Sequence, residues 1–142
     1  MRRHVWGLRA ALALLLGLLA LGLLPGTPAS AANLYPYGQC TYYAKRMRPD
    51  IANHWGNARS WAASARQAGF PVSATPRAGD IVVLQPGVQR VNRTYGHVAY
   101  VTTVRGTWFR TVSMWGNEAN GRLHVVWYHT GPGVSFIHKR SG

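Results

Sequence analysis

The residue pattern changes near Pro76, and this change restricts the folds that the chain can adopt. Before Pro76, apolar residues recur at helical spacing: Asn57 is placed to cap a helix over Ala58 to Ala68, and Gly69 is placed to end it. After Pro76, short apolar runs bounded by turn residues begin with Ile81 to Leu84. Helices first and antiparallel strands second predict an α+β fold.

The predicted helix has one apolar face that can pack closely on a flat surface, because its residues are small apart from one tryptophan. That face consists of Ala58, Trp61, Ala62, Ala65 and Ala68. The later strands are expected as a hairpin followed by two more runs. Their expected ranges are His97 to Val104, Trp108 to Trp115, Leu123 to His129 and Val134 to His138.

Residues 1–31 have the pattern of a secretory signal peptide. A start with three arginines is followed by an uncharged, leucine-rich core from Ala10 to Leu24, and Ala29-Ser30-Ala31 fits the small-residue cleavage site. The core is shorter than the ~20 residues that a membrane-spanning helix needs. We therefore expect an exported chain with one domain over residues 32–142 and no stable membrane insertion after the signal is removed, with a retained anchor as the alternative.

The chain is strongly basic: 16 Lys and Arg residues against three Asp and Glu residues give a formal net charge of +13. The basic residues are spread along the chain, so no basic tail or nuclear-type patch is expected. A spread positive field suits an anionic partner held without sequence readout, and for an exported chain an anionic cell wall is the expected partner. A charge that serves solubility is the alternative. No nucleic-acid partner is expected, because no recognition motif is present.

Cys40 is the only cysteine in the sequence. An exported chain with one thiol cannot form an internal disulfide, so the thiol serves another purpose. Gly38 breaks the backbone before it and Thr41 to Arg46 can continue as helix, which places the sulfur at a helix N-terminus that favours a thiolate. Far downstream, His97 opens an apolar, β-rich run. These are the two groups that cysteine nucleophilic catalysis needs.

Five short motifs follow one another along the chain: Gly38-Gln39-Cys40-Thr41, Trp55-Gly56-Asn57-Ala58, Trp61-Ala62, Ala78-Gly79-Asp80-Ile81 and Gly96-His97-Val98-Ala99. Together they resemble the CHAP domain, the cysteine/histidine-dependent amidohydrolase/peptidase family of bacterial and phage peptidoglycan hydrolases. The resemblance covers Leu34 to about His138. It implies a papain-like α+β fold with N-terminal helices packed on an antiparallel β-sheet. It also implies a nucleophilic cysteine, a histidine base, and an acidic or amide residue that orients the histidine.

On this resemblance, Cys40 is the expected nucleophile and His97 the expected general base. Gln39 and Tyr37 are candidates to help the backbone amides near Cys40 to bind the oxyanion. Asp80 lies in a turn before a strand and is expected to cap a backbone amide rather than to take part in catalysis.

Two aromatic residues, Tyr95 and Trp115, flank the expected site and are candidates to line a groove for glycan or stem peptide. A place in the core is the alternative, because aromatic residues are usually buried. Core positions are the default expectation for the tryptophans Trp55, Trp61, Trp108, Trp115 and Trp127.

The third catalytic residue is where the chain departs from the family pattern, a Ser-Glu-x-Asn-like segment on the strand after the histidine. Aligning Ser113 with this segment puts Met114 at the acid position, and a methionine is a poor hydrogen-bond acceptor. A longer hairpin puts Glu118 at the acid position and Asn120 at the amide position. We favour Glu118, the only acid in the region, followed by Asn117, because an amide can replace a carboxylate in cysteine enzymes.

No metal or other cofactor is expected, because one cysteine cannot form a thiolate cluster and the His-x-His pair of zinc peptidoglycan peptidases is absent. The resemblance implies a secreted, cell-wall-associated peptidoglycan hydrolase, expected as a monomer. The enzyme would be either an N-acetylmuramoyl-L-alanine amidase or an endopeptidase that cleaves a peptide bond in the stem or cross-bridge. The alternative is a catalytically inactive cell-wall-binding protein with the same fold.

Overall fold

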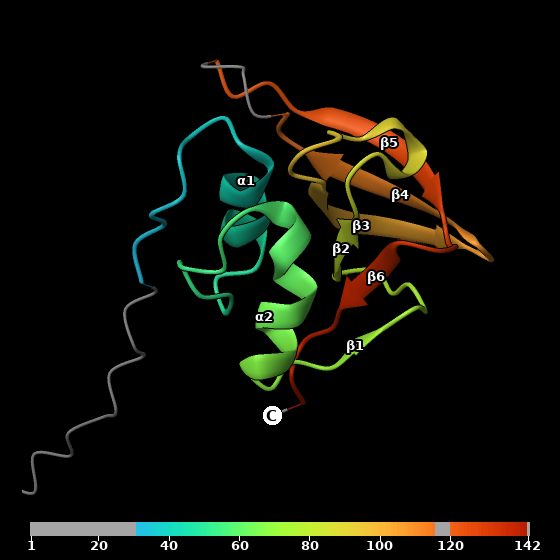
Figure 1. Cartoon of the computed structure of the whole chain (residues 1–142), viewed down its shortest axis with the longest axis horizontal. Coiled ribbons are helices and arrows are strands. Elements are labelled where there is room, and N and C mark those ends of the chain that lie inside the picture. The colour runs from blue at the N-terminus through green and yellow to red at the C-terminus, as the bar shows by residue number, and fades with distance from the viewer. Residues whose placement is uncertain (1–30, 116–119, 142) are drawn as a thin grey trace, which may run out of the picture.

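The computed structural model describes residues 31–115 and 120–141, in which two α-helices lie on one side of an antiparallel sheet (Figure 1). The helices are α1 (Cys40–Met47) and α2 (Trp61–Gln67), and two 3₁₀ turns are η1 (Ala58–Ser60) and η2 (Val88–Arg90). The strands are β1 (Val72–Ser73), β2 (Ile81–Leu84), β3 (His97–Arg105), β4 (Trp108–Ser113), β5 (His124–His129) and β6 (Val134–Ile137). The predicted α+β fold, with helices packed on an antiparallel sheet, is confirmed.

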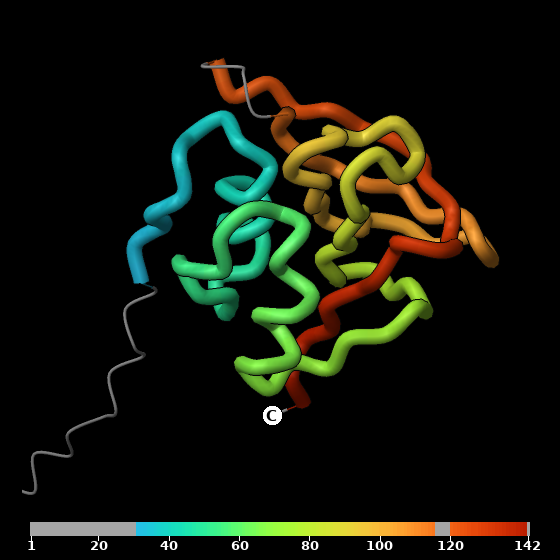
Figure 2. The backbone as a smooth tube through the Cα atoms, viewed as in Figure 1, coloured from blue at the N-terminus to red at the C-terminus, as the bar shows by residue number. Residues whose placement is uncertain are grey.

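The six described strands follow the order β1-β6-β2-β3-β4-β5, so the last strand of the chain lies between the first two. In β6, Phe136 pairs with Val82 of β2 and Ile137 pairs with Val72 of β1. The backbone tube shows this return, with the red C-terminal segment running beside β1 (Figure 2). The sequence pattern does not predict β1 or its pairing, because a two-residue strand has no periodicity of its own.

The predicted helix over Ala58 to Ala68 is only partly correct. The segment begins as the 3₁₀ turn η1 and becomes α-helical at Trp61, and the Asn57 side chain makes no capping hydrogen bond. Four of the five expected face residues are buried, but Ala68 is exposed because the helix ends before it. Gly69 follows with a φ of +80°, the left-handed conformation expected after a helix end.

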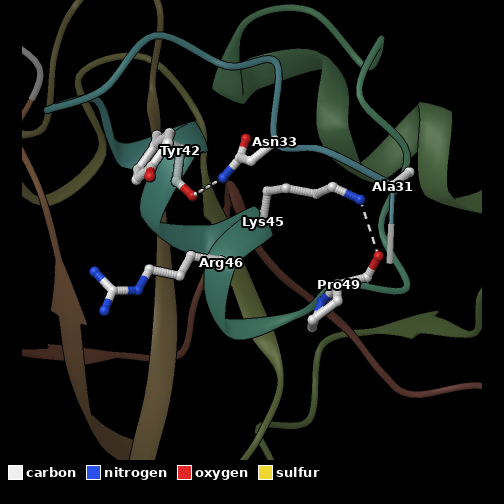
Figure 3. Close-up of a pocket in the computed structure, with 6 residues that line it drawn as sticks. All are labelled: Ala31, Asn33, Tyr42, Lys45, Arg46 and Pro49. Atoms are coloured by element: carbon white, nitrogen blue, oxygen red, sulfur yellow. Dashed lines mark hydrogen bonds between the residues drawn. The ribbon is translucent and has the colours of Figure 1, made fainter. Parts of the chain in front are cut away.

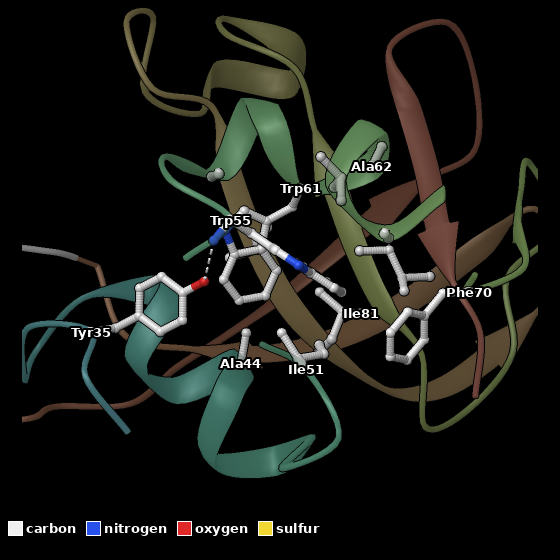
Figure 4. Close-up of a cluster of buried hydrophobic side chains, with 13 residues drawn as sticks. Tyr35, Ala44, Ile51, Trp55, Trp61, Ala62, Phe70 and Ile81 are labelled. Carbon is white, nitrogen blue, oxygen red and sulfur yellow. Dashed lines mark hydrogen bonds between the residues drawn. The ribbon is translucent and has the colours of Figure 1, made fainter. Parts of the chain in front are cut away.

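The main core lies between the helices and the sheet (Figure 4). Trp61 of α2 is fully buried at its centre, with its ring 5.3 Å from Tyr35 and 5.6 Å from Trp55 between centroids. The Tyr35 hydroxyl accepts a hydrogen bond from the Trp55 backbone N–H at 3.1 Å, which ties the segment before α1 to the segment before α2. This packing sets the position of α1 against the sheet.

A second core lies on the opposite face of the sheet, so β2 is buried on both faces. Ile81 and Val83 belong to the helix-side core, and Val82 and Leu84 belong to the second core. The predicted short buried run is thereby confirmed, along with the β3–β4 hairpin, although β4 ends at Ser113 rather than Trp115.

Buried polar contacts also fix α1 (Figure 3). The Lys45 Nζ, on a side chain only 3% exposed, donates to the carbonyl oxygens of Pro49 and Ile51, and burial lowers its pKa. The Asn33 Nδ2 donates to the Tyr42 carbonyl oxygen at 2.8 Å, which holds the preceding segment along the helix. Among the described residues, no helix is long and apolar enough to cross a membrane.

Candidate active site

Cys40 is the first residue of α1, as predicted. Gly38 has a φ of +89°, which turns the chain into the helix, and the first helical hydrogen bond runs from the Tyr43 N–H to the Gln39 carbonyl oxygen at 3.2 Å. The amides of Cys40 and Thr41 precede that bond and are therefore among the N–H groups that a helix leaves without a partner inside it. The Cys40 thiol thus lies beside unshared backbone donors.

The expected thiolate is not what the environment of Cys40 favours. Burial raises the pKa of the Cys40 thiol, and the backbone amides of Val98, Thr41 and Cys40 itself, which lower it, do not compensate. The position of Cys40 at a helix N-terminus predicted a lowered thiol pKa. That prediction was wrong, because the cost of burying the charged thiolate outweighs the stabilisation from the helix amides. The Val98 amide also shows that the sulfur lies next to the start of β3.

A groove with a volume of about 830 Å³ runs past the thiol. Of the residues predicted from the sequence, Cys40, His97, Gln39, Tyr95 and Trp115 line it. Tyr95 and Trp115 are exposed, which agrees with a place on a groove rather than in the core.

Tyr37 does not line this groove. Its ring packs edge-on against Tyr42 with centroids 5.1 Å apart, and its hydroxyl lies close to the backbone of Gly121. The structure therefore brings Gln39, but not Tyr37, into the groove with the thiol.

His97 opens β3 and is 7% exposed. Its Nε2 lies 2.9 Å from the Ser113 Oγ, and Ser113 is 1% exposed. Burial and the nearby His124 lower the pKa of His97 to about 4, so the imidazole is neutral at ordinary pH. With Nε2 occupied by the hydroxyl, Nδ1 is the nitrogen that can exchange a proton with a thiol.

The contact between His97 and Ser113 follows from the strand register. Tyr100 of β3 pairs with Val112 of β4, so one step further along, Ser113 lies beside Ala99. Ala99 and His97 point to the same face of β3, because side chains alternate along a strand. Ser113 thus reaches His97 diagonally across the sheet.

Sequence reasoning did not assign Ser113 a role. The signal was present, because Ser113 heads the segment that resembles the family's third-residue motif, but that motif has its acid at the following position. That next residue, Met114, is 2% exposed and is a core side chain.

The favoured third residues, Glu118 and Asn117, lie outside the described residues. Asn120 is described, and its Oδ1 accepts a hydrogen bond from the Arg122 N–H at 3.1 Å, a local turn contact. The assignment of Glu118 or Asn117 therefore stays a prediction.

The default expectation for the tryptophans holds for two of the five named. Trp55 and Trp61 are buried, whereas Trp108, Trp115 and Trp127 are 50%, 53% and 39% exposed. Trp108 lies on β4 and Trp127 on β5, the two strands at the β5 edge of the sheet. The Arg105 guanidinium lies over the Trp127 ring at 5.4 Å from its centroid, a contact that suits a solvent-facing indole.

A second buried polar cluster lies at the other end of β2. The Asp80 Oδ2 accepts the Arg77 N–H at 2.7 Å, which confirms the expected capping role, and its Oδ1 lies 2.9 Å from the His138 Nδ1. The His138 Nε2 lies 2.7 Å from the Ser73 Oγ. Burial raises the pKa of Asp80 despite the opposing effect of His138. Among the described residues, no group of three or more His, Cys, Asp or Glu side chains is arranged to hold a metal ion.

Residues 30–120 match the CHAP domain. This chain belongs to the CHAP domain family. It is 41% identical over 106 residues to the staphylococcal secretory antigen ssaA2 of Staphylococcus aureus (strain MRSA252), and 36% identical over 114 residues to the antigen SsaA of strain NCTC 8325 / PS 47. These alignments cover 74% and 80% of this chain but 33% and 37% of the relatives, so the chain spans about a third of their length.

The crystal structure of an N-acetylmuramoyl-L-alanine amidase from Staphylococcus aureus has a similar fold to this CHAP domain. The TM-score is 0.68 at 27% sequence identity, over 79% of this chain and 33% of the amidase chain. The helices and the sheet of this chain are therefore arranged as in that amidase structure, which agrees with the family match.

Proposed function

We propose that this CHAP domain is a peptidoglycan hydrolase that cleaves an amide bond by cysteine nucleophilic catalysis. The observation that carries the proposal is that Cys40 and His97, which are distant in sequence, line the same groove. The sulfur lies against the Val98 backbone amide, directly after the histidine, so the two side chains belong to one local structure. The amidase fold of the structural neighbour and the family match support the same reaction class.

In the first half of the reaction, His97 Nδ1 takes the proton of the Cys40 thiol as the sulfur attacks the amide carbonyl carbon. The imidazolium then gives this proton to the leaving amine, the C–N bond breaks, and a thioester to Cys40 remains. In the second half, His97 removes a proton from water, the hydroxide attacks the thioester, and the C–S bond breaks. The acid product leaves, and the sulfur recovers its proton from His97.

The raised pKa of Cys40 and the lowered pKa of His97 are compatible with this sequence, because they describe a neutral thiol and a neutral base at rest. Proton transfer then accompanies attack instead of preceding it. The Cys40 backbone amide in the first turn of α1 and the Gln39 side chain at the groove are the proposed donors to the oxyanion.

Export and wall association are part of the proposal. The signal-like residues 1–31 and the secretory names of the relatives support an extracellular location. The net charge of +13, to which three arginines of residues 1–31 contribute, stays strongly positive without them and supports attraction to an anionic wall. We propose that the bond cleaved is either the lactyl amide to the first stem residue or a peptide bond of the stem or cross-bridge.

The proposal is tested with purified wild-type protein and Cys40→Ala on peptidoglycan sacculi, with soluble products read by mass spectrometry. Product release by the wild type alone supports the cysteine hydrolase, and product masses assign the bond. If neither protein releases products while both bind the sacculi, the hydrolase is refuted in favour of the inactive wall-binding protein.

A further inference from the structure

In the described part of the site, the ring of His97 is hydrogen-bonded to Ser113 and not to a carboxylate. The Oγ of Ser113 is 2.9 Å from His97 Nε2, and both side chains are buried, at 1% and 7% exposure. A buried hydrogen bond of this length fixes the rotation of the ring. Ser113 is itself held at the end of β4 by its pairing with His124 of β5.

A serine hydroxyl has the chemistry that this position requires. When the imidazole is neutral with its proton on Nε2, the N–H donates to the Ser113 Oγ, and the Nδ1 lone pair is left to accept a proton. When the imidazole gains the thiol proton at Nδ1, the same Nε2–H bond to Ser113 persists. The hydroxyl can accept this bond in both protonation states, and because it can also donate to an unprotonated Nε2, it holds the position of the ring rather than its tautomer.

The carboxylates within the described ranges are not available to His97. Asp50 is paired with Arg48, and Asp80 is hydrogen-bonded to His138. The titratable and charged groups that act on His97 or line a cavity with it in those ranges are Tyr35, Cys40, His54, Arg90, Tyr95, His124 and Tyr128. None of these supplies a fixed negative charge at Nε2 in the resting thiol form.

We propose that Ser113 is the positioning residue of the Cys40–His97 site, an uncharged hydroxyl that takes the orienting role for which the family resemblance implies an acid or amide. This inference rests on the proposed function and refines it. It assigns the orienting role to a strand residue held in the β4–β5 pairing, instead of to Glu118 or Asn117. Without a negative charge at Nε2, the site acts through a neutral imidazole.

Turnover on sacculi is the first readout, with Ser113→Ala, Ser113→Thr and the matched control Ser73→Ala. Ser73 makes the same kind of bond to the ring of His138, so the control removes an equivalent hydroxyl away from the groove. We expect Ser113→Ala to lower turnover roughly 100-fold, because a misplaced catalytic group costs about that much. Ser113→Thr keeps the hydroxyl and is expected within about threefold of wild type, and Ser73→Ala is expected to match wild type per folded molecule.

The second readout is the pH dependence of Cys40 alkylation by iodoacetamide, which requires no knowledge of the substrate. A carboxylate in Ser113→Asp next to Nε2 is expected to raise the pH at which His97 titrates by about 1–3 units. Ser73→Asp is the matched control and is expected to leave the alkylation profile unchanged. This shift is expected even if sacculi are not a substrate, so failure of the proposed function and failure of this inference are distinguishable.

The inference is overturned if Ser113→Ala keeps wild-type turnover, or if Glu118→Gln lowers turnover more than Ser113→Ala does. It is also overturned if Ser113→Asp alkylates with the wild-type pH profile. Because the alkylation test uses a different substitution from the turnover test, misfolding of one variant does not protect the inference.

Discussion

The two buried histidines of this fold, His97 and His138, have similar exposure but different partners. Both are less than 10% exposed, and both have a serine Oγ within hydrogen-bond distance of Nε2, at 2.9 Å and 2.7 Å. His138 also has the Asp80 carboxylate at Nδ1, so both of its ring nitrogens are used within the fold. His97 has its hydroxyl partner on one side and lines the groove with the thiol on the other.

The difference shows which histidine is suited to chemistry. A ring with both nitrogens held by buried partners links chain segments, here β1, the start of β2 and the end of β6. A ring held at one nitrogen keeps the other for proton exchange. In the described part of the chain, the carboxylate partner, usually taken as a sign of a catalytic histidine, belongs to His138.

Arginine completes the structural region around His138. The buried Arg48 guanidinium donates to the carbonyl oxygens of Gly79, Ile137 and His138, all at 3.2 Å, and pairs with Asp50 at 2.8 Å. The segment after α1 is thereby joined to both β2 and β6. The groove region has no comparable ionic network among the described residues.

The largest expected effects come from replacing each histidine by alanine. His97→Ala is expected to lower turnover about 10²- to 10⁴-fold, the usual contribution of a general base, and to cost about 1–3 kcal/mol of unfolding free energy because the buried Ser113 hydroxyl loses its partner. His138→Ala leaves the Asp80 carboxylate buried without its partner and is expected to cost about 3–5 kcal/mol of stability. Turnover per folded molecule and urea unfolding measure the two effects. If His138→Ala lowered turnover more and His97→Ala lowered stability more, the assignment of the two histidines would be contradicted.

A smaller effect is expected when the carboxylate charge is removed from the structural region. Asp80→Asn keeps the shape but weakens the contacts to His138 and Arg77, at an expected cost of about 1–3 kcal/mol. The matched control is Asp50→Asn, whose side chain is 37% exposed and whose ion pair is expected to contribute at most about 1 kcal/mol. If Asp80→Asn and Asp50→Asn lost the same unfolding free energy in urea, burial would not explain a difference between the two carboxylates.

The pH dependence of turnover sharpens the comparison further. Burial and His124 lower the pKa of His97 to about 4, so the neutral base is present above that pH and is lost as the pH falls through it. Turnover at pH 5.5 is therefore expected to stay close to its value at pH 7. A histidine with an ordinary pKa of about 6.5 would lose roughly tenfold over that interval. If turnover instead falls on the acid side with a midpoint near pH 6.5, the lowered pKa of His97 would be contradicted.

The smallest expected effect concerns the thiol itself. Because burial raises the pKa of Cys40, iodoacetamide is expected to label it at pH 7 no faster than a free cysteine. Labelling followed by mass spectrometry in wild type and His97→Ala measures this rate. Rapid labelling in the wild type that slows in His97→Ala would reveal a resting ion pair and contradict the neutral site.

Much of this arrangement could be predicted from local sequence. Gly38 before Cys40 and the apolar run after His97 indicated a helix start and a strand start, and both are present. These signals are local because turn residues and periodicity act over a few residues. They were enough to predict Cys40 at the start of a helix and His97 at the start of a strand.

The rest depended on contacts between distant residues. The insertion of β6 between β1 and β2 has no local signal, and the Ser113 contact with His97 depends on the register of the β3–β4 hairpin, which shifts between Val101 and Thr103. The pKa of Cys40 was predicted in the wrong direction because sequence shows the helix start but not the surrounding burial. The exposure of Trp127 likewise depends on which strand becomes the sheet edge.

The most direct test of the account is to trap the covalent intermediate. Wild-type protein is mixed with soluble peptidoglycan fragments, quenched in acid within the first turnovers and digested, and the peptide that contains Cys40 is weighed by mass spectrometry. The account predicts an acyl group on Cys40 that disappears as product accumulates and that is absent in Cys40→Ala. Product formation by Cys40→Ala, or turnover by the wild type with its acyl group on another residue, would contradict it.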